Sequence, residues 1–433
     1  MSASPFVSPD DIRAAFSHAM SAMYRAEVPL YGDLVEIVEG VNAEVLRADP
    51  GLEANLERRG ETARLSAERH GAIRVGTAAE LAILRRAFAV MGMAPVGYYD
   101  LSLAGVPVHS TAFRPTDEAA LRRNPFRVFT SLLRIELIED AALRETAQAV
   151  LEGRDIVSPE ARALLARWEA EGGLTADEAD RFVAALLETF RWHGDALVDG
   201  TTYARLHDAH RLVADVVSFR GPHINHLTPR TLDIDAAQAE MVRRGMAAKA
   251  VIEGPPPRAV PILLRQTSFT ALDEPVRFAG TGGGTHTARF GEIEQRGVAL
   301  TRKGRALYDR LLDEARGASG SQGADYAERL ARAFQAFPDS EDALREQGLA
   351  YFRYRASPNG TVVAEPITYE DFLPVSAAGI FQSNLGGTEQ HSYAGEAAQR
   401  VFEEALGCPV LDPFALYDAI EQASVEALAG AVA

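Results

Sequence analysis

Apolar residues recur every three to four positions through the first part of the chain, a spacing that predicts amphipathic helices. The helices predicted from this pattern cover residues 12–24, 31–46, 52–68 and 78–91. Ser8, Pro9 and Asp10 precede the first of them, an order typical of a helix start, because serine caps free amides and an acid favours the positive helix end. We therefore expect the N-terminal part, about residues 1–92, to be helical.

A second helical pattern covers about residues 140–211, and strand-like patterns lie on both sides of it. The strand-like segments are 96–113, interpreted as two short strands, then 216–219, 223–228, 259–272, 276–279, 285–300, 349–354 and 361–364. The later helical segments are 234–249, 304–315, 325–337, 340–347, 395–406 and 413–428. Strands interrupted by helices without regular alternation predict an α+β fold. No internal repeat is evident by eye.

We expect a single catalytic unit over residues 1–433, in which different segments have different roles. A β core contributed by about 66–113 and 216–390 is expected to bind the metal. The helical insertion, about 140–211, contains no motif and is interpreted as a scaffold or lid. Two C-terminal helices are expected within about 391–433.

Composition narrows the classes of partner. The chain has 44 basic and 61 acidic residues, a net charge of −17, which disfavours binding to nucleic acid or to an anionic membrane. A single cysteine, Cys408, excludes an internal disulfide and a cysteine-based zinc site. The first residues do not have the pattern of a signal peptide, and no apolar run reaches the length of about 18 residues that a membrane helix needs. A cytoplasmic protein is the expectation. Lys249 and Lys303 are the only lysines, which we interpret as compositional bias.

His70 and Arg74 lie four residues apart in SAERHGAIRVGT, residues 66–77. That spacing puts both side chains on one side of either a helix or a strand. A neutral imidazole can bind a transition metal, and a guanidinium can hold a carboxylate through two hydrogen bonds. The pair is therefore a candidate for metal and substrate binding.

Two further histidines lie between Pro222 and Pro229, in a segment too short for a helix and suited to a strand. Side chains alternate between the two faces of a strand, so His223 and His226 are expected to point in opposite directions. Only one of them should therefore bind a metal directly. The pattern does not decide which, and a polar edge strand is the alternative.

Candidate carboxylates occur in THTARFGEIEQRG, residues 285–297. Glu292 and Glu294 share one face of the predicted strand, and a glutamate that faces a core is costly unless it is paired or binds a metal. His286 and Arg289 are further polar candidates in the same segment. The pattern again leaves the choice between the two glutamates open.

Two histidines and one carboxylate from separate elements make the facial triad of non-haem iron(II) oxygenases. This triad leaves three coordination positions open. A 2-oxo acid can fill two of them with its carboxylate and keto oxygens, and dioxygen can take the third. The chemistry therefore suits a decarboxylating oxygenase, although such widely separated residues have little specificity as a motif.

Four segments together resemble one known family. They are SAERHGAIRVGT, FRGPHINHLTPRTLDID (219–235), FGEIEQRG (290–297) and YEDFLPVSAAGIFQSNLG (369–386). They are similar to the 2-oxoadipate dioxygenase/decarboxylase family, also called 2-hydroxyglutarate synthase, and the resemblance covers nearly the whole chain. It implies a core similar to the vicinal-oxygen-chelate fold, with a partly closed β-barrel around one metal and extensive helical additions. The implied cofactor is Fe(II), with His70, His226 and Glu294 as its ligands; His223 and Glu292 remain secondary candidates.

The resemblance also implies a substrate and a reaction. Arg74 corresponds to the arginine that holds the substrate carboxylate, and Val375 and Ser376 to the backbone and hydroxyl patch beside the bound oxo acid. The implied reaction converts 2-oxoadipate and dioxygen to 2-hydroxyglutarate and carbon dioxide in lysine catabolism. The expected partners are thus a small 2-oxo dicarboxylate and O2, while the oligomeric state is not predicted. Two alternatives are a zinc or manganese lyase, isomerase or hydrolase on the same fold, and a non-catalytic 2-oxo acid binding protein.

Overall fold

The structure is a computed structural model that describes residues 6–280, 282–317, 325–357, 359–373 and 388–432. The chain divides into two compact units. The first unit comprises Met1–Lys249, Ser268–Ile293 and Gly386–Val410. The second comprises Ala250–Thr267, Glu294–Leu385 and Leu411–Ala433. The expectation of one catalytic unit stays a prediction.

The first unit begins with the predicted run of helices: α1 (Pro9–Glu27), α2 (Pro29–Ala48), α3 (Pro50–Arg59) and α4 (Thr62–Ala67). The hydroxyl of Ser8 accepts a hydrogen bond from the Asp11 amide at 3.1 Å, so the predicted cap of α1 is confirmed. The single helix predicted over 52–68 is instead two. Gly60 adopts a left-handed conformation with φ of 68° and ends α3, a conformation that glycine takes at little cost.

Two modules build the central sheet, each with four strands and a helix after the first strand, and the first module has a further helix, α6, before its last strand. The first contains β1 (Arg69–Val75), α5 (Ala78–Val90), β2 (Ala94–Asp100), β3 (Val108–Arg114), α6 (Glu118–Arg123) and β4 (Arg127–Leu133). The second contains β5 (His226–Pro229), α12 (Ile234–Arg243), β6 (Leu264–Ser268), β7 (Leu272–Arg277) and β8 (Gly283–Arg296). In each module the first strand is parallel to the last, and the last is antiparallel to the strand before it in the chain. The topology thus contains an internal repeat that inspection of the sequence did not find.

The two modules meet where β1 pairs antiparallel with β5. The resulting strand order is β2-β3-β4-β1-β5-β8-β6, and β7 pairs with β8 outside this path. Within the described residues β2 has no partner on its outer side, so the sheet is an open, curled half-barrel. The predicted α+β class with a partly closed barrel is confirmed. The last residues of β8 and most of β6 belong to the second unit.

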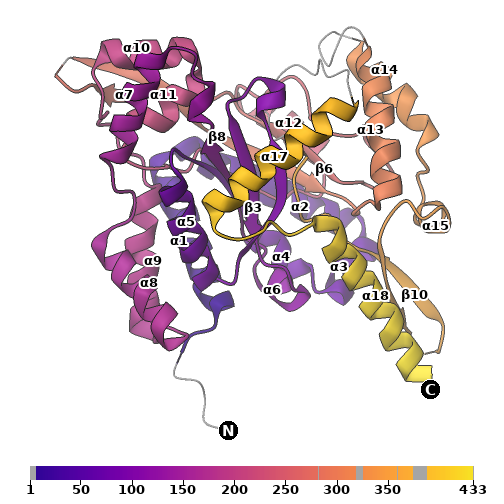
Figure 1. Ribbon diagram of the computed structural model, residues 1–433. Coiled ribbons are helices and arrows are strands. Elements are labelled where there is room, and N and C mark those ends of the chain that lie inside the picture. Colours follow the sequence, from indigo (N-terminus) through magenta and orange to yellow (C-terminus); the bar gives the residue numbers. More distant parts are fainter. Residues whose placement is uncertain (1–5, 281, 318–324, 358, 374–387, 433) are drawn as a thin grey trace. The chain divides into compact units, whose positions relative to one another are not determined.

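The helical insertion lies between the two modules in the chain. It consists of α7 (Ala141–Glu152), α8 (Pro159–Glu171), α9 (Ala176–Leu187), α10 (Gly200–Ala209) and α11 (Arg211–Ser218). In Figure 1 α7, α10 and α11 form one group, and α8 and α9 form another beside α1. The strand predicted at 216–219 is wrong, because α11 extends to Ser218. Val213, Val216 and Val217 pack into one core cluster at helical spacing, so packing overrides the strand preference of valine.

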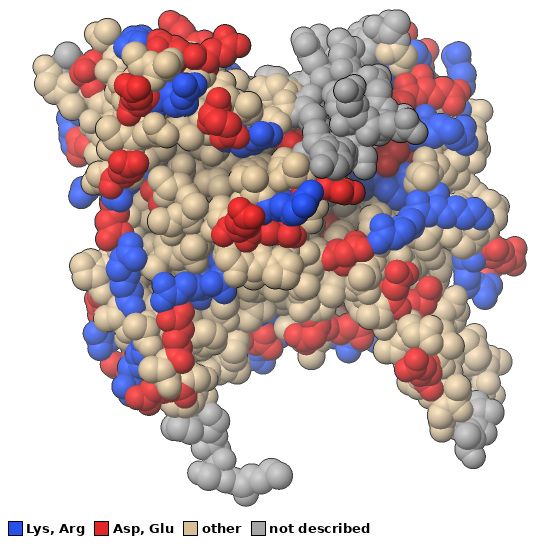
Figure 2. Space-filling model, in the orientation of Figure 1, with Lys and Arg blue, Asp and Glu red and all other residues tan. Residues whose placement is uncertain are grey.

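The second unit contains the predicted later elements: α13 (Arg302–Arg316), α14 (Tyr326–Ala333), α15 (Glu341–Glu346), β9 (Phe352–Ala356), β10 (Val362–Pro366) and α18 (Pro413–Val432). The helix α17 (Thr388–Leu406) lies in the first unit, next to α5 and β2. Short 3-10 turns occur at Ser102–Ala104, Ile135–Leu137, Glu188–Phe190 and Phe334–Ala336. Among the described helices, none has both the length and the apolar character required to cross a membrane. Figure 2 shows acidic and basic side chains interspersed over the visible face.

Candidate metal centre

Three neighbouring strands of the first unit direct ligand-type side chains to one face of the sheet. The register places Ala72 of β1 opposite His226 of β5, and His226 opposite Phe290 of β8. Side chains two residues apart on a strand share a face. His70 therefore lies on the same face as Ala72, and Glu292 on the same face as Phe290. Pairing of β1, β5 and β8 is thus enough to bring His70, His226 and Glu292 together.

The three side chains converge on one point, and we call them the metal cluster. The Nε2 atoms of His70 and His226 lie 3.2 and 3.6 Å from Oε2 of Glu292. The two imidazole rings are nearly perpendicular, at 89°, with centroids 5.5 Å apart. Two ligand atoms that each lie about 2.1 Å from one ion at a right angle are about 3.0 Å apart. The donor set and its spacing therefore fit a single transition-metal ion.

The burial of the metal cluster sets the charge of its members. The side chain of His70 is 1% exposed, whereas those of His226 and Glu292 are 12% and 15% exposed, so the cluster is reached from one side. Burial lowers the pKa of His226 to about 4, and the imidazole is therefore neutral and able to coordinate a metal at neutral pH. Burial opposes ionisation of Glu292, but His226, His70 and Lys249 outweigh it and lower the pKa of this carboxyl. Two neutral nitrogens and one carboxylate are what the facial triad requires.

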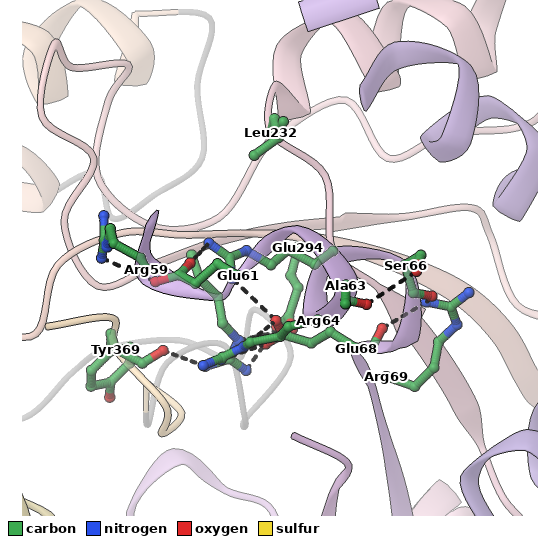
Figure 3. A network of polar contacts seen from close by, with 12 residues as sticks. Arg59, Glu61, Ala63, Arg64, Ser66, Glu68, Arg69, Leu232, Glu294 and Tyr369 are labelled. Carbon is green, nitrogen blue, oxygen red and sulfur yellow. Dashed lines mark hydrogen bonds and ion pairs between the residues drawn. The ribbon is translucent and has the colours of Figure 1, made fainter. Parts of the chain in front are cut away.

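A buried ion network holds the strand ends next to His70. Glu68, at the C-terminal cap of α4, is fully buried and lies 3.0 Å from Nε of Arg64, 2.8 Å from Nη1 of Arg127 and 3.1 Å from Nη1 of Arg230. Burial raises the pKa of Glu68, but the three guanidinium groups overcome this and hold it well below its usual range. Figure 3 shows Glu68 beside Arg64 within this network. The network joins the beginnings of β1 and β4 to the end of β5.

Close packing and one tyrosine fix the remaining backbone of the metal cluster. A Cβ added to Gly71 would lie 2.9 Å from the backbone oxygen of His226 and 2.5 Å from Ile224, so only glycine lets β1 approach β5 here. The hydroxyl of Tyr24 in α1 lies 2.9 Å from the Asn225 carbonyl and 2.7 Å from the Phe290 carbonyl. The tyrosine thus joins the strands that carry His226 and Glu292.

Arg74 lies on β1 with His70, as the four-residue spacing predicted, and Cα atoms four residues apart on a strand are about 13 Å apart. Its Nη1 donates to Oδ2 of Asp215 at 2.7 Å. The charges of Arg74 and Lys249 both act on His226, where they help to lower its pKa. The metal cluster therefore lies in a locally positive region, although the whole chain is acidic. Lys249 was not selected as a site residue from the sequence. The available signal was that it is one of only two lysines in the chain.

A second group of ligand-type side chains, the Asp215 cluster, lies behind Arg74. It consists of Asp215, His223 and His286, all buried. Oδ1 of Asp215 lies 2.9 Å from Nε2 of His286 and 3.3 Å from Nε2 of His223. His223 therefore belongs to this cluster and not to the metal cluster, as expected if only one of the two histidines is a direct ligand. Asp215 was missed in the sequence, where it is hidden in an apolar helical segment.

Glu294, the third ligand that the resemblance implied, lies in the second unit, and its role as a metal ligand stays a prediction. Within the second unit, Oε1 and Oε2 of Glu294 accept hydrogen bonds of 2.9 Å from Nε and Nη2 of Arg296, and both side chains are fully buried. Arg296 also donates to the carbonyl oxygens of Tyr369 and Asp371. Glu292, the secondary candidate, is the carboxylate beside the histidines.

Other predicted site residues have varied outcomes. Val375 and Ser376 lie outside the described residues. Arg289 lies 2.8 Å from Glu274 and 2.5 Å from Glu27, so its charge is used in structural ion pairs. The predicted helical insertion, about 140–211, and the helix α11 that continues beyond it supply side chains to the Asp215 cluster, while a role as scaffold or lid stays a prediction. These side chains are Asp215 itself, Trp192, whose ring lies parallel to His286, and Tyr203, which contacts the same histidine.

Comparisons with known proteins agree in the family that they indicate. Residues 16–384 match the model of the 2-oxoadipate dioxygenase/decarboxylase family. An Escherichia coli (strain K12) protein named 2-oxoadipate dioxygenase/decarboxylase is 59% identical over 438 residues, which covers 96% of this chain and 98% of the relative. A Pseudomonas putida protein of the same name is 56% identical over 459 residues, covering 100% and 99%. The crystal structure of hydroxyglutarate synthase from Pseudomonas putida in complex with 2-oxoadipate is similar at a TM-score of 0.93 and 55% identity, covering 99% of both chains.

Proposed function

Because the chain belongs to the 2-oxoadipate dioxygenase/decarboxylase family, we propose that it converts 2-oxoadipate and O2 to 2-hydroxyglutarate and CO2. The atoms balance, since one oxygen atom enters the new carboxylate and the other the new hydroxyl group. We propose Fe(II) as the metal and His70, His226 and Glu292 as its ligands. A place in lysine catabolism remains a prediction from the resemblance.

One observation favours this function most strongly: one buried imidazole, one partly buried imidazole and one carboxylate converge within coordination distance in the metal cluster. A sensor or carrier of 2-oxo acids needs a basic pocket but has no use for such a set of ligands. A three-residue set leaves room for a chelating substrate and for dioxygen. The Glu294–Arg296 ion pair already satisfies the other candidate carboxylate, which supports Glu292 as the third ligand.

Iron(II), when bound, would supply the redox chemistry that dioxygen requires. The residues of the chain would hold the substrate and set its direction. Arg74 would hold the distal carboxylate of the diacid by paired charge-assisted hydrogen bonds, which orients the carbon to be hydroxylated. Lys249, whose charge acts on both His226 and Glu292, would help to attract the anionic oxo acid. Val375 and Ser376 are proposed, on the resemblance alone, to complete the pocket.

Oxygen uptake by the metal-free protein tests this function. Uptake and release of CO2 should begin only when Fe(II) and 2-oxoadipate are both added, and 2-hydroxyglutarate should form in equal amount. Zn(II) in place of Fe(II) should give no turnover. Turnover with zinc in the absence of oxygen would instead establish the lyase, isomerase or hydrolase alternative.

The role of Arg74 has its own test. Arg74→Ala should reduce kcat/KM for 2-oxoadipate by about a hundredfold or more, because a charge-assisted pair contributes about 1.5–3 kcal/mol and orientation contributes further. Metal content should stay unchanged. The matched control is Arg86→Ala, which removes an exposed arginine paired with Glu169 and should leave kcat/KM unchanged. Equal loss of turnover and metal in Arg74→Ala would contradict a substrate-binding role.

A further inference from the structure

Arg74 is anchored at one point. Its Nη1 lies 2.7 Å from Oδ2 of Asp215, and its other N–H groups make no hydrogen bond to any residue that the structure describes. The side chain is 26% exposed, whereas that of Asp215 is 7% exposed. One edge of the guanidinium is thus fixed from behind, and the rest of the group remains available to an anion.

Asp215 is itself held by the two imidazoles of its cluster. Its Oδ1 lies 2.9 Å from Nε2 of His286 and 3.3 Å from Nε2 of His223, while Oδ2 is left for Arg74. The hydroxyl of Tyr203 lies 2.7 Å from Nδ1 of His286, which orients that ring. The ring of Trp192 stacks on that of His286, with centroids 6.1 Å apart and planes within 4° of parallel.

We propose that Asp215 is a positioning residue that fixes the guanidinium of Arg74 for the distal carboxylate of the substrate. This inference rests on the proposed function. The contacts Tyr203–His286–Asp215–Arg74 link α10 and α11 to β1, which carries Arg74 on the same face as His70 of the metal cluster. The insertion therefore contributes to substrate selection and is more than a scaffold.

The charge of Asp215 makes this role distinguishable from simple attraction. A carboxylate beside Arg74 neutralises part of its charge, so it weakens the ionic attraction for a dicarboxylate. What it provides is a fixed direction, because a long arginine side chain otherwise samples many rotamers. Removal of Asp215 should therefore reduce kcat, which depends on orientation, far more than it raises KM.

A second metal ion in the Asp215 cluster is the competing interpretation, since the three ligand atoms lie within 4.8 Å of one another. The guanidinium of Arg74 lies on the same carboxylate, however, and its positive charge repels a divalent cation. The hydrogen bonds among Asp215, His286 and Tyr203 also satisfy the polar atoms without a metal. The geometry thus favours positioning of Arg74.

Steady-state kinetics of Asp215→Asn, with Fe(II) bound, tests the proposal. We expect kcat for 2-oxoadipate to fall by about tenfold to a hundredfold, with KM changed by no more than about threefold. The same variant should turn over 2-oxohexanoate, which lacks the distal carboxylate, at about the wild-type rate. Asp215→Glu should recover part of the lost kcat. Tyr203→Phe, which removes only the outer hydrogen bond, should give a smaller loss in the same direction and serves if Asp215→Asn does not fold.

The matched control is Asp100→Asn. Asp100, at the end of β2, forms an ion pair with Arg134, so this variant also removes the charge of an aspartate paired with an arginine. It should leave kcat for both acids unchanged. Unchanged kcat in Asp215→Asn, or equal loss with both acids, would overturn the proposal. The proposal would also be overturned if the wild-type protein bound two metal ions per chain and Asp215→Asn bound only one. If wild type does not turn over 2-oxohexanoate, the split between kcat and KM for 2-oxoadipate decides alone. Absence of oxygen-dependent turnover of 2-oxoadipate by wild type would instead refute the proposed function.

Discussion

Replacing Glu292 and Glu294 by glutamine, one at a time, should separate metal binding from folding. Glu292 lies 3.2 Å from His70 and 3.6 Å from His226, whereas both oxygens of Glu294 accept hydrogen bonds from Arg296. Glutamine keeps the size of each side chain and removes only its charge. Glu292→Gln should therefore lose metal and keep its fold, and Glu294→Gln should do the opposite.

The two effects have different sizes. Mutation of a residue that only supports a metal ligand typically costs 10–100-fold in affinity, so loss of a ligand carboxylate should cost about a hundredfold or more. Removing one partner of a buried ion pair costs about 3–5 kcal/mol, because the remaining charge is left without compensation. For Glu294→Gln in a chain of 433 residues this corresponds to a fall in Tm of roughly 3–6 °C. Glu292→Gln, which leaves two imidazoles without an ion, should change the stability of the metal-free protein by less than about 2 kcal/mol.

The assay combines elemental analysis of iron after dialysis with thermal unfolding of the metal-free proteins. The double variant Glu294→Gln with Arg296→Met provides a control, since it removes both buried charges and should regain part of the stability lost in Glu294→Gln. The reasoning is refuted if Glu294→Gln loses iron at normal Tm while Glu292→Gln retains it. That result would return the third ligand to the residue that the family resemblance implied.

Three further predictions concern stability. His226→Ala should abolish the rise in Tm that Fe(II) gives wild type, a rise equivalent to about 2.7 kcal/mol at a metal concentration of a hundred times Kd; an equal rise in the variant would exclude His226 as a ligand. Burial, assisted by nearby Arg134, lowers the pKa of His109 to about 4. The folded state thus binds fewer protons, so this contribution to stability is complete above about pH 6.5 and falls towards pH 4 by about 3 kcal/mol. Urea unfolding of His109→Phe should show a smaller loss of unfolding free energy than wild type between pH 6.5 and about pH 4. Parallel plots of unfolding free energy against pH for the two proteins would contradict this. Tyr24→Phe should lower the free energy of unfolding by about 1–3 kcal/mol, because two buried carbonyls lose a donor. A change below about 0.5 kcal/mol in urea unfolding would contradict this.

Local pattern predicted the helices and the alternating strands but not the strand that completes the first module. Every residue of β4, Arg127–Leu133, is buried, so the segment has none of the alternation that reveals a half-buried strand. Without β4 the first module has no parallel partner for β1. The repeat of modules, which depends on the β1–β4 and β5–β8 pairs, could therefore not be recognised from the sequence.

The choice between the two glutamates could not be made from the sequence pattern either, because it depends on register between distant strands. Glu292 and Glu294 share one face of β8, and only the pairing of His226 with Phe290 shows which of them lies beside the histidines. One local signal did exist. Arg296 lies two residues after Glu294 on the same strand face, so the sequence itself offers a buried Glu294 a charge partner.

The same reasoning identifies Asp215 in retrospect. It lies among valines and alanine in the segment RLVADVVS, where an aspartate on the buried side of a helix requires a cationic or hydrogen-bonding partner. Three of the polar residues selected for other reasons, Arg74, His223 and His286, prove to be its partners. A buried aspartate within an apolar helical segment is therefore the signal that should have linked this helix to the site.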